Sequence, residues 1–227
     1  MYHQVEELPD RGSPFRYLNV APVNFLRQMQ WLKRAGWTGL SVRNLQPYLR
    51  GERTGKVVGI TFDDGFRNVY ENALPVLNEF GFTATTYFVT SQVGGFNDWD
   101  TGMGAARTAC MSKQQVREWV GFGHEAGSHT LDHVHLSAVE PSEARRQIFD
   151  SRHVLEDMTG EAVEGFAYPY GDVSPDVRSM VADCGYALGT TTRRGRARPQ
   201  DDMLLLPRRI VRSRDNWFNV LFKCAAG

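Results

Sequence analysis

Apolar positions along this chain follow two alternating periods. Short runs rich in β-branched and aromatic residues predict strands at residues 2–5, 38–41, 56–62, 83–89, 124–128, 163–168, 186–192 and 204–211. Apolar residues three or four positions apart predict helices at residues 22–36, 42–49, 67–80, 112–122, 141–158, 174–184 and 215–223. Because strands and helices alternate, the sequence predicts a parallel α/β sheet, either open or closed into a barrel.

Three local features refine this prediction. Pro75 lies inside the helical pattern of residues 67–80 and predicts a kink or a restart there. Ser112 and Gln115 have the spacing of a capping box at the start of a helix. Residues 91–111 contain four glycines and are predicted to form a long loop, a kind of segment that is often functional in compact domains.

The size and charge of the chain limit what it can be. Its 227 residues, without an internal repeat or a linker, predict one domain over residues 1–227. The formal net charge is zero, so no global field attracts nucleic acid, and no nucleic-acid partner is expected. The basic stretch 193–198 is interpreted as a solvated loop. The three cysteines are widely spaced and indicate neither a disulfide framework nor a zinc finger.

Targeting signals are missing from the sequence as given. No apolar run is long enough to span a bilayer, so no transmembrane segment is expected. The opening residues lack the basic region and apolar core of a signal peptide. The chain as it stands is therefore expected in the cytoplasm, and a periplasmic or extracellular location is expected if its start has been trimmed.

Two adjacent carboxylates stand at the end of a predicted buried strand. Asp63 and Asp64 directly follow the apolar part of the 56–62 run, and Gly65 permits a sharp turn after them. Like charges this close do not both stay ionised unless a positive charge lies beside them. A divalent metal ion supplies such a charge, with one aspartate as its ligand and the other free as a base. The alternative is a solvated Asp-Gly turn.

A histidine pair follows the next predicted strand but one. His129 and His133 are four residues apart, and on a helical turn that spacing places both imidazoles on one face, where they reach one metal ion. They come after strand 124–128, and sites in α/β folds gather at the carboxyl ends of parallel strands. One aspartate with two histidines is a known facial triad with open positions. The alternative is a pair of ordinary histidines, since His124 and His135 lie nearby.

Aromatic residues mark two further candidate positions. The turn Tyr168-Pro169-Tyr170-Gly171 follows strand 163–168 and has a rigid backbone that can direct an amide N–H into a site. The alternative is an aromatic turn packed on the core. Trp99 lies between two aspartates in the loop 91–111, where its ring either stacks on a sugar or fills the loop.

Together these stretches resemble the three main motifs of the polysaccharide deacetylases, the carbohydrate esterase family 4 enzymes with the NodB homology domain. The matching segments are Thr61–Gly65, Gly127–His133 and Tyr168–Gly171, in the order of the family. The resemblance covers nearly the whole chain. It implies a distorted (β/α) barrel with fewer than eight complete units. It also implies metal-dependent removal of acetyl groups from N-acetylated sugars, with an N-acetylated glycan as the substrate.

The resemblance also implies a role for individual residues. Asp63 matches the catalytic base, and the backbone N–H of Tyr170 matches the donor that stabilises the oxyanion. Substrate contacts are expected from Trp99, Tyr168 and Pro169. The cofactor is expected to be one divalent metal ion, with zinc as the first expectation and nickel or cobalt as alternatives. Its ligands are expected to be Asp64, His129 and His133.

The chain departs from the common pattern of the family at two positions. Many members carry an arginine just before the proline-containing turn, but Ala167 stands there, so the orienting arginine is expected to be absent. Many members also carry a histidine acid on the last strand, and residues 204–211 contain none. The opening residues 1–5 are instead similar to a subgroup, including deacetylases of poly-β-1,6-N-acetylglucosamine, in which this motif lies at the N-terminus. His3 is therefore the expected general acid.

Three other interpretations remain at this stage. The same fold hydrolyses other C–N bonds, such as an N-formyl group or a cyclic imide, and the sequence does not separate these substrates. A catalytically weak glycan-binding module is disfavoured, because binding alone does not need Asp63 as a free base beside a metal ion. A purely structural α/β domain is disfavoured by the agreement of motifs on separate strands.

Overall fold

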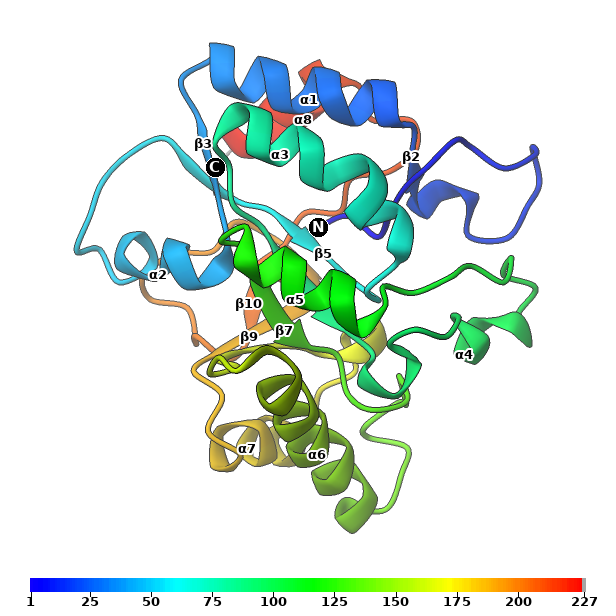
Figure 1. Cartoon of the computed structure of the whole chain (residues 1–227). Coiled ribbons are helices and arrows are strands. Elements are labelled where there is room, and N and C mark those ends of the chain that lie inside the picture. Colours follow the sequence, from blue (N-terminus) through cyan, green and yellow to red (C-terminus); the bar gives the residue numbers. More distant parts are fainter. Residues whose placement is uncertain (226–227) are drawn as a thin grey trace.

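The structure is a computed structural model that describes residues 1–225. At its centre is a six-stranded sheet whose neighbouring strands are all parallel, in the order β10-β9-β8-β7-β6-β5 (Figure 1). These strands are β5 (Thr61–Phe62), β6 (Thr85–Phe88), β7 (Glu125–Ser128), β8 (Gly165–Ala167), β9 (Leu188–Arg194) and β10 (Leu206–Arg208). Two smaller parallel pairs are β1 (Gln4–Val5) with β2 (Asn19–Val20) and β3 (Thr38–Leu40) with β4 (Val57–Gly59).

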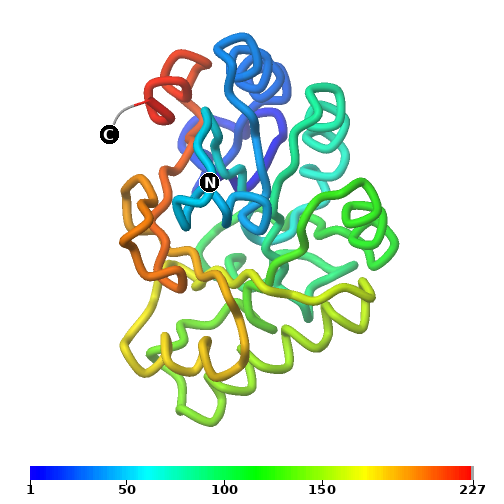
Figure 2. The backbone as a smooth tube through the Cα atoms, turned by 90° about the vertical axis from the view of Figure 1, so that its left-hand side faces the viewer, coloured from blue at the N-terminus to red at the C-terminus, as the bar shows by residue number. Residues whose placement is uncertain are grey.

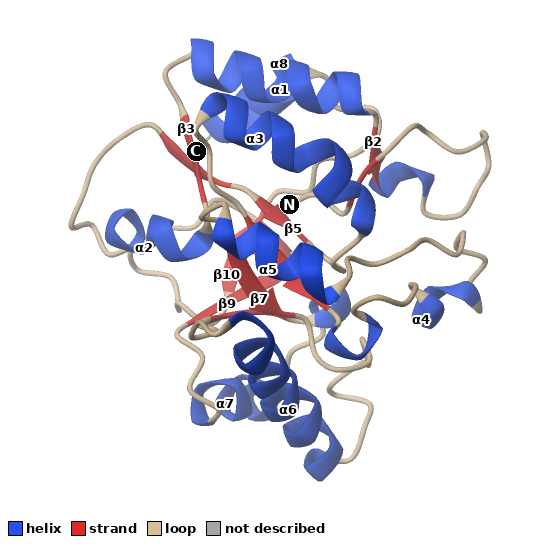
Figure 3. Ribbon diagram, viewed as in Figure 1, coloured by secondary structure: helices blue, strands red, loops and turns tan. Residues whose placement is uncertain are grey.

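Helices surround the strands on the outside (Figure 3). Ser112 and Gln115 form the predicted capping box at the start of α5, and Gly160 adopts the left-handed conformation that ends α6. Within the described residues no helix is both long enough and apolar enough to cross a bilayer. The helices are α1 (Pro22–Arg34), α2 (Val42–Leu49), α3 (Leu74–Phe80), α4 (Asp98–Thr101), α5 (Lys113–Gly121), α6 (Pro141–Thr159), α7 (Pro175–Asp183) and α8 (Trp217–Ala225).

The first two residues bridge the two edges of the six-stranded sheet. On one side, the Met1 amino group donates to Arg209 O at 3.0 Å, and Val211 N donates to Met1 O at 2.8 Å. On the other side, Tyr2 N donates to Thr61 O at 2.8 Å. Figure 2 shows the N-terminus inside the molecule, between the cyan and the orange-red segments. The sheet thus curls into a distorted (β/α) barrel with fewer than eight complete units, as predicted.

Alternation along the strands separates an outer apolar layer from a polar barrel interior. Phe62 faces the helices, and the Trp119 ring of α5 packs edge-on against it with ring centroids 6.2 Å apart. Tyr87 and Glu125 face the interior. Gly127 leaves room for Tyr87, because a Cβ at that position would lie 2.5 Å from the Tyr87 ring. Polar groups therefore line the interior beneath the carboxyl ends of the strands.

Three segments differ from the sequence prediction. The run 56–62 divides at Ile60, whose N–H donates to Leu40 O, so β4 pairs with β3 whereas β5 pairs with β6. A π-helical stretch, Val69–Ala73, precedes α3, and Pro75 lies in the first turn of α3, which is the predicted restart. The predicted loop 91–111 contains the short helix α4. The division at Ile60 follows from its hydrogen bond to Leu40, a long-range contact that the local pattern does not reveal.

We expect Tyr2→Ala to destabilise the fold by about 3–5 kcal/mol, in the range for deletion of a buried aromatic ring. Tyr2 is 3% exposed, packs against Phe25 and Phe62 with centroids 5.3 and 5.4 Å away, and donates its hydroxyl to Gln28. Denaturant unfolding measures the change. Tyr17→Ala is the matched control, since Tyr17 is 47% exposed and its loss should change the free energy of unfolding by less than about 1 kcal/mol. Equal effects of the two substitutions would contradict closure by the N-terminal residues.

Candidate active site

The chain reverses direction sharply after β5, and this turn carries the two carboxylates of Asp63 and Asp64. Asp64 and Gly65 both adopt left-handed backbone conformations, with φ of 77° and 74°. Gly65 also packs against Phe88, where a Cβ would lie 2.6 Å from the ring. Both Asp63 and Asp64 are buried. Burial raises the pKa of Asp64, so this carboxylate needs a positive charge to remain ionised.

The segment between His129 and His133 is an irregular turn, contrary to the helical turn predicted from the spacing. Thr130 and His133 have φ of 69° and 59°, which no α-helix accommodates. The Gln147 side chain of α6 accepts hydrogen bonds from two successive backbone N–H groups of the turn, at 3.1 and 2.9 Å. The turn is therefore shaped by α6, and the two imidazoles converge through left-handed residues instead of helical periodicity.

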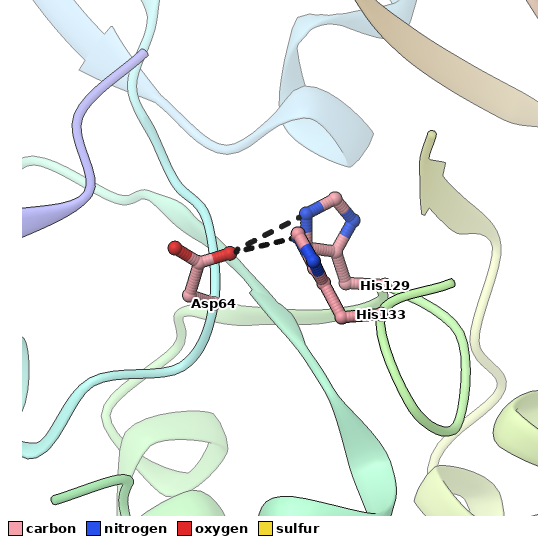
Figure 4. A group of neighbouring side chains, drawn as sticks. All are labelled: Asp64, His129 and His133. Carbon is pink, nitrogen blue, oxygen red and sulfur yellow. Dashed lines mark ion pairs between the residues drawn. The ribbon is translucent and has the colours of Figure 1, made fainter. Parts of the chain in front are cut away.

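Asp64, His129 and His133 meet at one point (Figure 4). The Nε2 atoms of His129 and His133 lie 3.5 and 3.4 Å from Asp64 Oδ1, and one donor atom from each residue lies within 4.8 Å of the others. All three side chains are buried. One carboxylate oxygen and two imidazole nitrogens are a donor set that suits zinc and similar divalent metals.

The protonation states of His129 and His133 suit the binding of a metal ion. His129 Nδ1 lies 2.7 Å from the Ala167 carbonyl, so it donates there and leaves Nε2 as a free lone pair toward Asp64. Burial lowers the pKa of both His129 and His133 to about 4. His133 Nδ1 is buried without a hydrogen-bond partner in the described structure. Both imidazoles are therefore neutral near pH 7, which is the form that binds a metal ion.

Asp63 is held by an arginine that the sequence analysis did not identify. Arg208 of β10 binds its carboxylate with two hydrogen bonds, Nη1 to Oδ1 at 2.6 Å and Nη2 to Oδ2 at 2.7 Å. Arg208 Nη1 also donates to Thr61 Oγ1, and Nε donates to Thr191 O. Ala167 leaves the usual arginine position empty, but the expectation that no arginine orients the base is wrong, because Arg208 reaches it from another strand.

The arginine also decides the charge of Asp63. Burial alone would raise the pKa of Asp63, but the charge and hydrogen bonds of Arg208 lower it well below the ordinary range. Asp63 is therefore ionised at all ordinary pH values. Both of its oxygens bind the guanidinium, so Asp63 is not arranged as a second carboxylate ligand beside Asp64.

His3 lies beside the two aspartates. Tyr2 points into the outer core, so alternation along the extended chain turns His3 toward the barrel interior. The backbone places His3 next to the two aspartates, since Asp63 N donates to Tyr2 O at 3.0 Å. Burial lowers the pKa of His3, while the charges of Asp64 and Asp63 raise it in part. Its Nδ1 atom is buried without a hydrogen-bond partner among the described residues. The imidazole is thus available to a group that enters the pocket.

The aromatic residues divide into two sets. The Trp99 ring lies 5.1 Å from the His133 ring, and the Tyr170 ring lies 4.5 Å from it, so both border the cluster. Tyr170 has φ of 58°, and its hydroxyl donates to Asp100 of α4 at 3.3 Å. This bond connects the loop 91–111 to the turn after β8.

Tyr168 and Pro169 occupy a different environment. Both are buried, and Tyr168 is only 1% exposed and packs edge-on against Phe166 with centroids 5.0 Å apart. Their side chains support the Tyr170 turn from the core side. The burial does not support the expectation that they contact substrate. Asp100 was not identified from the sequence, although its neighbour Trp99 was.

Comparisons with known proteins agree with this geometry. A model of the polysaccharide deacetylase family matches residues 50–189. A poly-β-1,6-N-acetyl-D-glucosamine N-deacetylase of Staphylococcus epidermidis is 27% identical over 203 residues, which are 85% of this chain and 68% of that protein.

Two solved structures are similar over nearly the whole chain. The Streptococcus pyogenes deacetylase PplD, in complex with acetate, is 27% identical with a TM-score of 0.86, covering 99% of this chain and 96% of that one. IcaB from Ammonifex degensii is 26% identical with a TM-score of 0.84, covering 99% and 95%. With the fold, the motif residues and the family match in agreement, the chain belongs to the polysaccharide deacetylase family.

Proposed function

We propose that the chain catalyses metal-dependent hydrolysis of the acetamido group of an N-acetylated glycan, with β-1,6-linked N-acetylglucosamine as the first substrate to test. The substrate is suggested by the S. epidermidis relative, which is named for that activity. The observation that supports this reaction is that two adjacent buried carboxylates have different surroundings. Asp64 points at two neutral imidazoles, whereas the adjacent Asp63 is ionised and fixed by Arg208.

An amide is a poor electrophile with a poor leaving group, so three tasks must be met. Asp64, His129 and His133 would hold one divalent ion, which would supply Lewis acidity toward a water molecule and the amide carbonyl. Asp63 accepts the proton of the attacking water. Because Arg208 lowers the pKa of Asp63, this base is weak. The proton transfer therefore depends on a water molecule whose own pKa is lowered.

Two further groups act on the substrate side. The backbone N–H of Tyr170 donates to the developing oxyanion, a contribution of about 2.7–4 kcal/mol for one such donor. His3 donates a proton to the leaving amine. His3 and Asp63 thus divide the proton transfers between an acid and a base. Trp99 lies beside His133 and offers a face on which a sugar ring stacks.

We expect His129→Ala and His133→Ala each to remove most of the bound metal. Each substitution deletes one of three protein donors. His135→Ala is the matched control, because His135 is exposed and stacks on Tyr170 without pointing at Asp64. Metal content is measured by elemental analysis after dialysis against limiting zinc, nickel or cobalt. Wild-type metal retention should fall as the pH drops toward about 4, where both histidines become protonated. Metal loss in the His135 variant alone would reject the ligand set.

The reaction itself is tested by acetate release from β-1,6- and β-1,4-linked N-acetylglucosamine oligomers, with and without added metal. We expect Asp63→Asn to retain metal but to lose about 10²–10⁴-fold in turnover, the usual contribution of base catalysis. Normal turnover of Asp63→Asn would remove Asp63 as the base. Release of formate from N-formylated sugars, with no acetate from any oligomer, would instead support the rival substrate on the same site.

We expect His3→Ala to lower turnover about 10²-fold while metal content stays at the wild-type level, because no ligand is lost. The pH–rate profile should lose its alkaline limb, which reports the protonated acid. Burial lowers the pKa of His3, so that limb in the wild type should lie below the ordinary histidine value of about 6.5. A variant that keeps the alkaline limb would show that another group protonates the amine.

A further inference from the structure

A large cavity lies apart from the metal-ligand cluster. It has a volume of about 620 Å³, within the range of small-molecule sites. Its walls come from α2, β4 and the following chain on one side, β10 and residues 195–199 on another, and α1 and α8 behind. None of Asp64, His129 and His133 lines it. The cavity also borders the support of Asp63: Arg208 binds that carboxylate, Thr61 accepts a hydrogen bond from Arg208, and Tyr2 O accepts one from Asp63 N.

The cavity exists because the barrel closes incompletely. Among the described residues, Met1 and Tyr2 bridge the two sheet edges at Thr61 and Asp63 on one side and at residues 209–211 on the other. Upstream of Thr61 the chain leaves the main sheet, since β4 pairs with β3. The space between β4 and β10 is then left to side chains of α2 and the neighbouring loops, which do not fill it.

The interior of this cavity is apolar. Its lining includes Leu45, Leu49, Val57, Leu206 and Val220. Burial of an alkyl chain against such a surface is favourable by the removal of apolar area from water. A glycan does not match it, because a sugar chain is polar on both edges.

The charged groups of the cavity all have one sign. Six arginine or lysine residues line it and no aspartate or glutamate does, although the whole chain has 26 of each sign. Arg53, Arg196 and Arg198 are exposed at its mouth, and none of the ion pairs between described residues includes them. Guanidinium groups match the geometry of carboxylate oxygens and bind them with two hydrogen bonds.

We infer that this cavity binds a monoacyl anion, with the alkyl chain among the apolar residues and the carboxylate at Arg53, Arg196 and Arg198. The charge complementarity selects an anionic head and excludes the deacetylated glycan, whose amine is cationic. The proposed head-group arginines are separate from the proposed metal ligands, although Arg208, which holds Asp63, lines the same cavity.

Calorimetric titration of the full chain with octanoate, decanoate and dodecanoate below their micelle concentrations tests the inference. Affinity should rise about tenfold for every two methylene groups added, as expected for an alkyl chain that enters an apolar site. Octyl β-glucoside, with the same chain length as octanoate but no charge, should bind at least fivefold more weakly than octanoate. Acetate should not bind there.

Two sets of substitutions test the binding of the carboxylate head group and of the alkyl chain separately. Arg196→Gln with Arg198→Gln should weaken decanoate about tenfold, while Arg193→Gln with Arg194→Gln, in the same stretch but outside the cavity, should change it less than twofold. Ala197→Trp fills the cavity from a loop and should abolish binding, with circular dichroism as the check on folding. The arginine pair keeps the test decisive if the tryptophan variant does not fold.

Several results would overturn the inference. These are no binding of dodecanoate, affinity that does not depend on chain length, or equal loss in the two arginine pairs. Binding to vesicles of phosphatidylglycerol that depends on Arg196 and Arg198, without binding of any soluble fatty acid, would make this face a membrane contact instead.

Discussion

Two carboxylates buried side by side at the end of one strand need two separate sources of positive charge. Asp63 receives one from Arg208 within the protein, through two short hydrogen bonds. Asp64 has no such partner and points at two neutral imidazoles. Because Arg208 already compensates Asp63, Asp64 is the carboxylate that remains for the proposed metal ion. Removing the guanidinium would leave both carboxylates uncompensated and would destabilise the barrel interior.

Local patterns in the sequence predicted most of the elements and a parallel α/β sheet, open or closed. The distorted barrel and the choice of Asp64 to join His129 and His133 came from the family resemblance. Local patterns did not predict contacts between residues that are far apart in the sequence. Arg208 lies 145 residues from Asp63, and no local pattern connects the two. Leu206 and Arg208 are two positions apart on β10, but a register shift between them interrupts the pairing with β9, so alternation alone does not place Arg208. The helical reading of the histidine turn failed because Gln147, on a later helix, fixes its backbone.

Strained backbone is concentrated at the site. Among the described residues, five that are not glycine have left-handed φ, and four of them are Asp64, Thr130, His133 and Tyr170. Such conformations cost about 1–3 kcal/mol each and persist only where the surroundings determine them. Here the turns follow directly from β5, β7 and β8, and the hydrogen bond from Tyr170 to Asp100 connects the last of them to the loop 91–111. The turns are therefore pre-shaped before any ligand arrives, which limits reorganisation during a reaction.

The bridge formed by Met1 and Tyr2 also sets an order of events during synthesis. The amino group of Met1 bonds to a carbonyl 208 residues away, on the segment that follows β10. On a ribosome residues 1 and 2 emerge long before residues 209–211 exist, so the barrel stays open until that segment has been made. Ordering so long a loop is entropically slow, and exposed sheet edges invite wrong pairing meanwhile. Closure of the barrel, which brings His3 to the aspartates, is thus a late event in the life of each new chain.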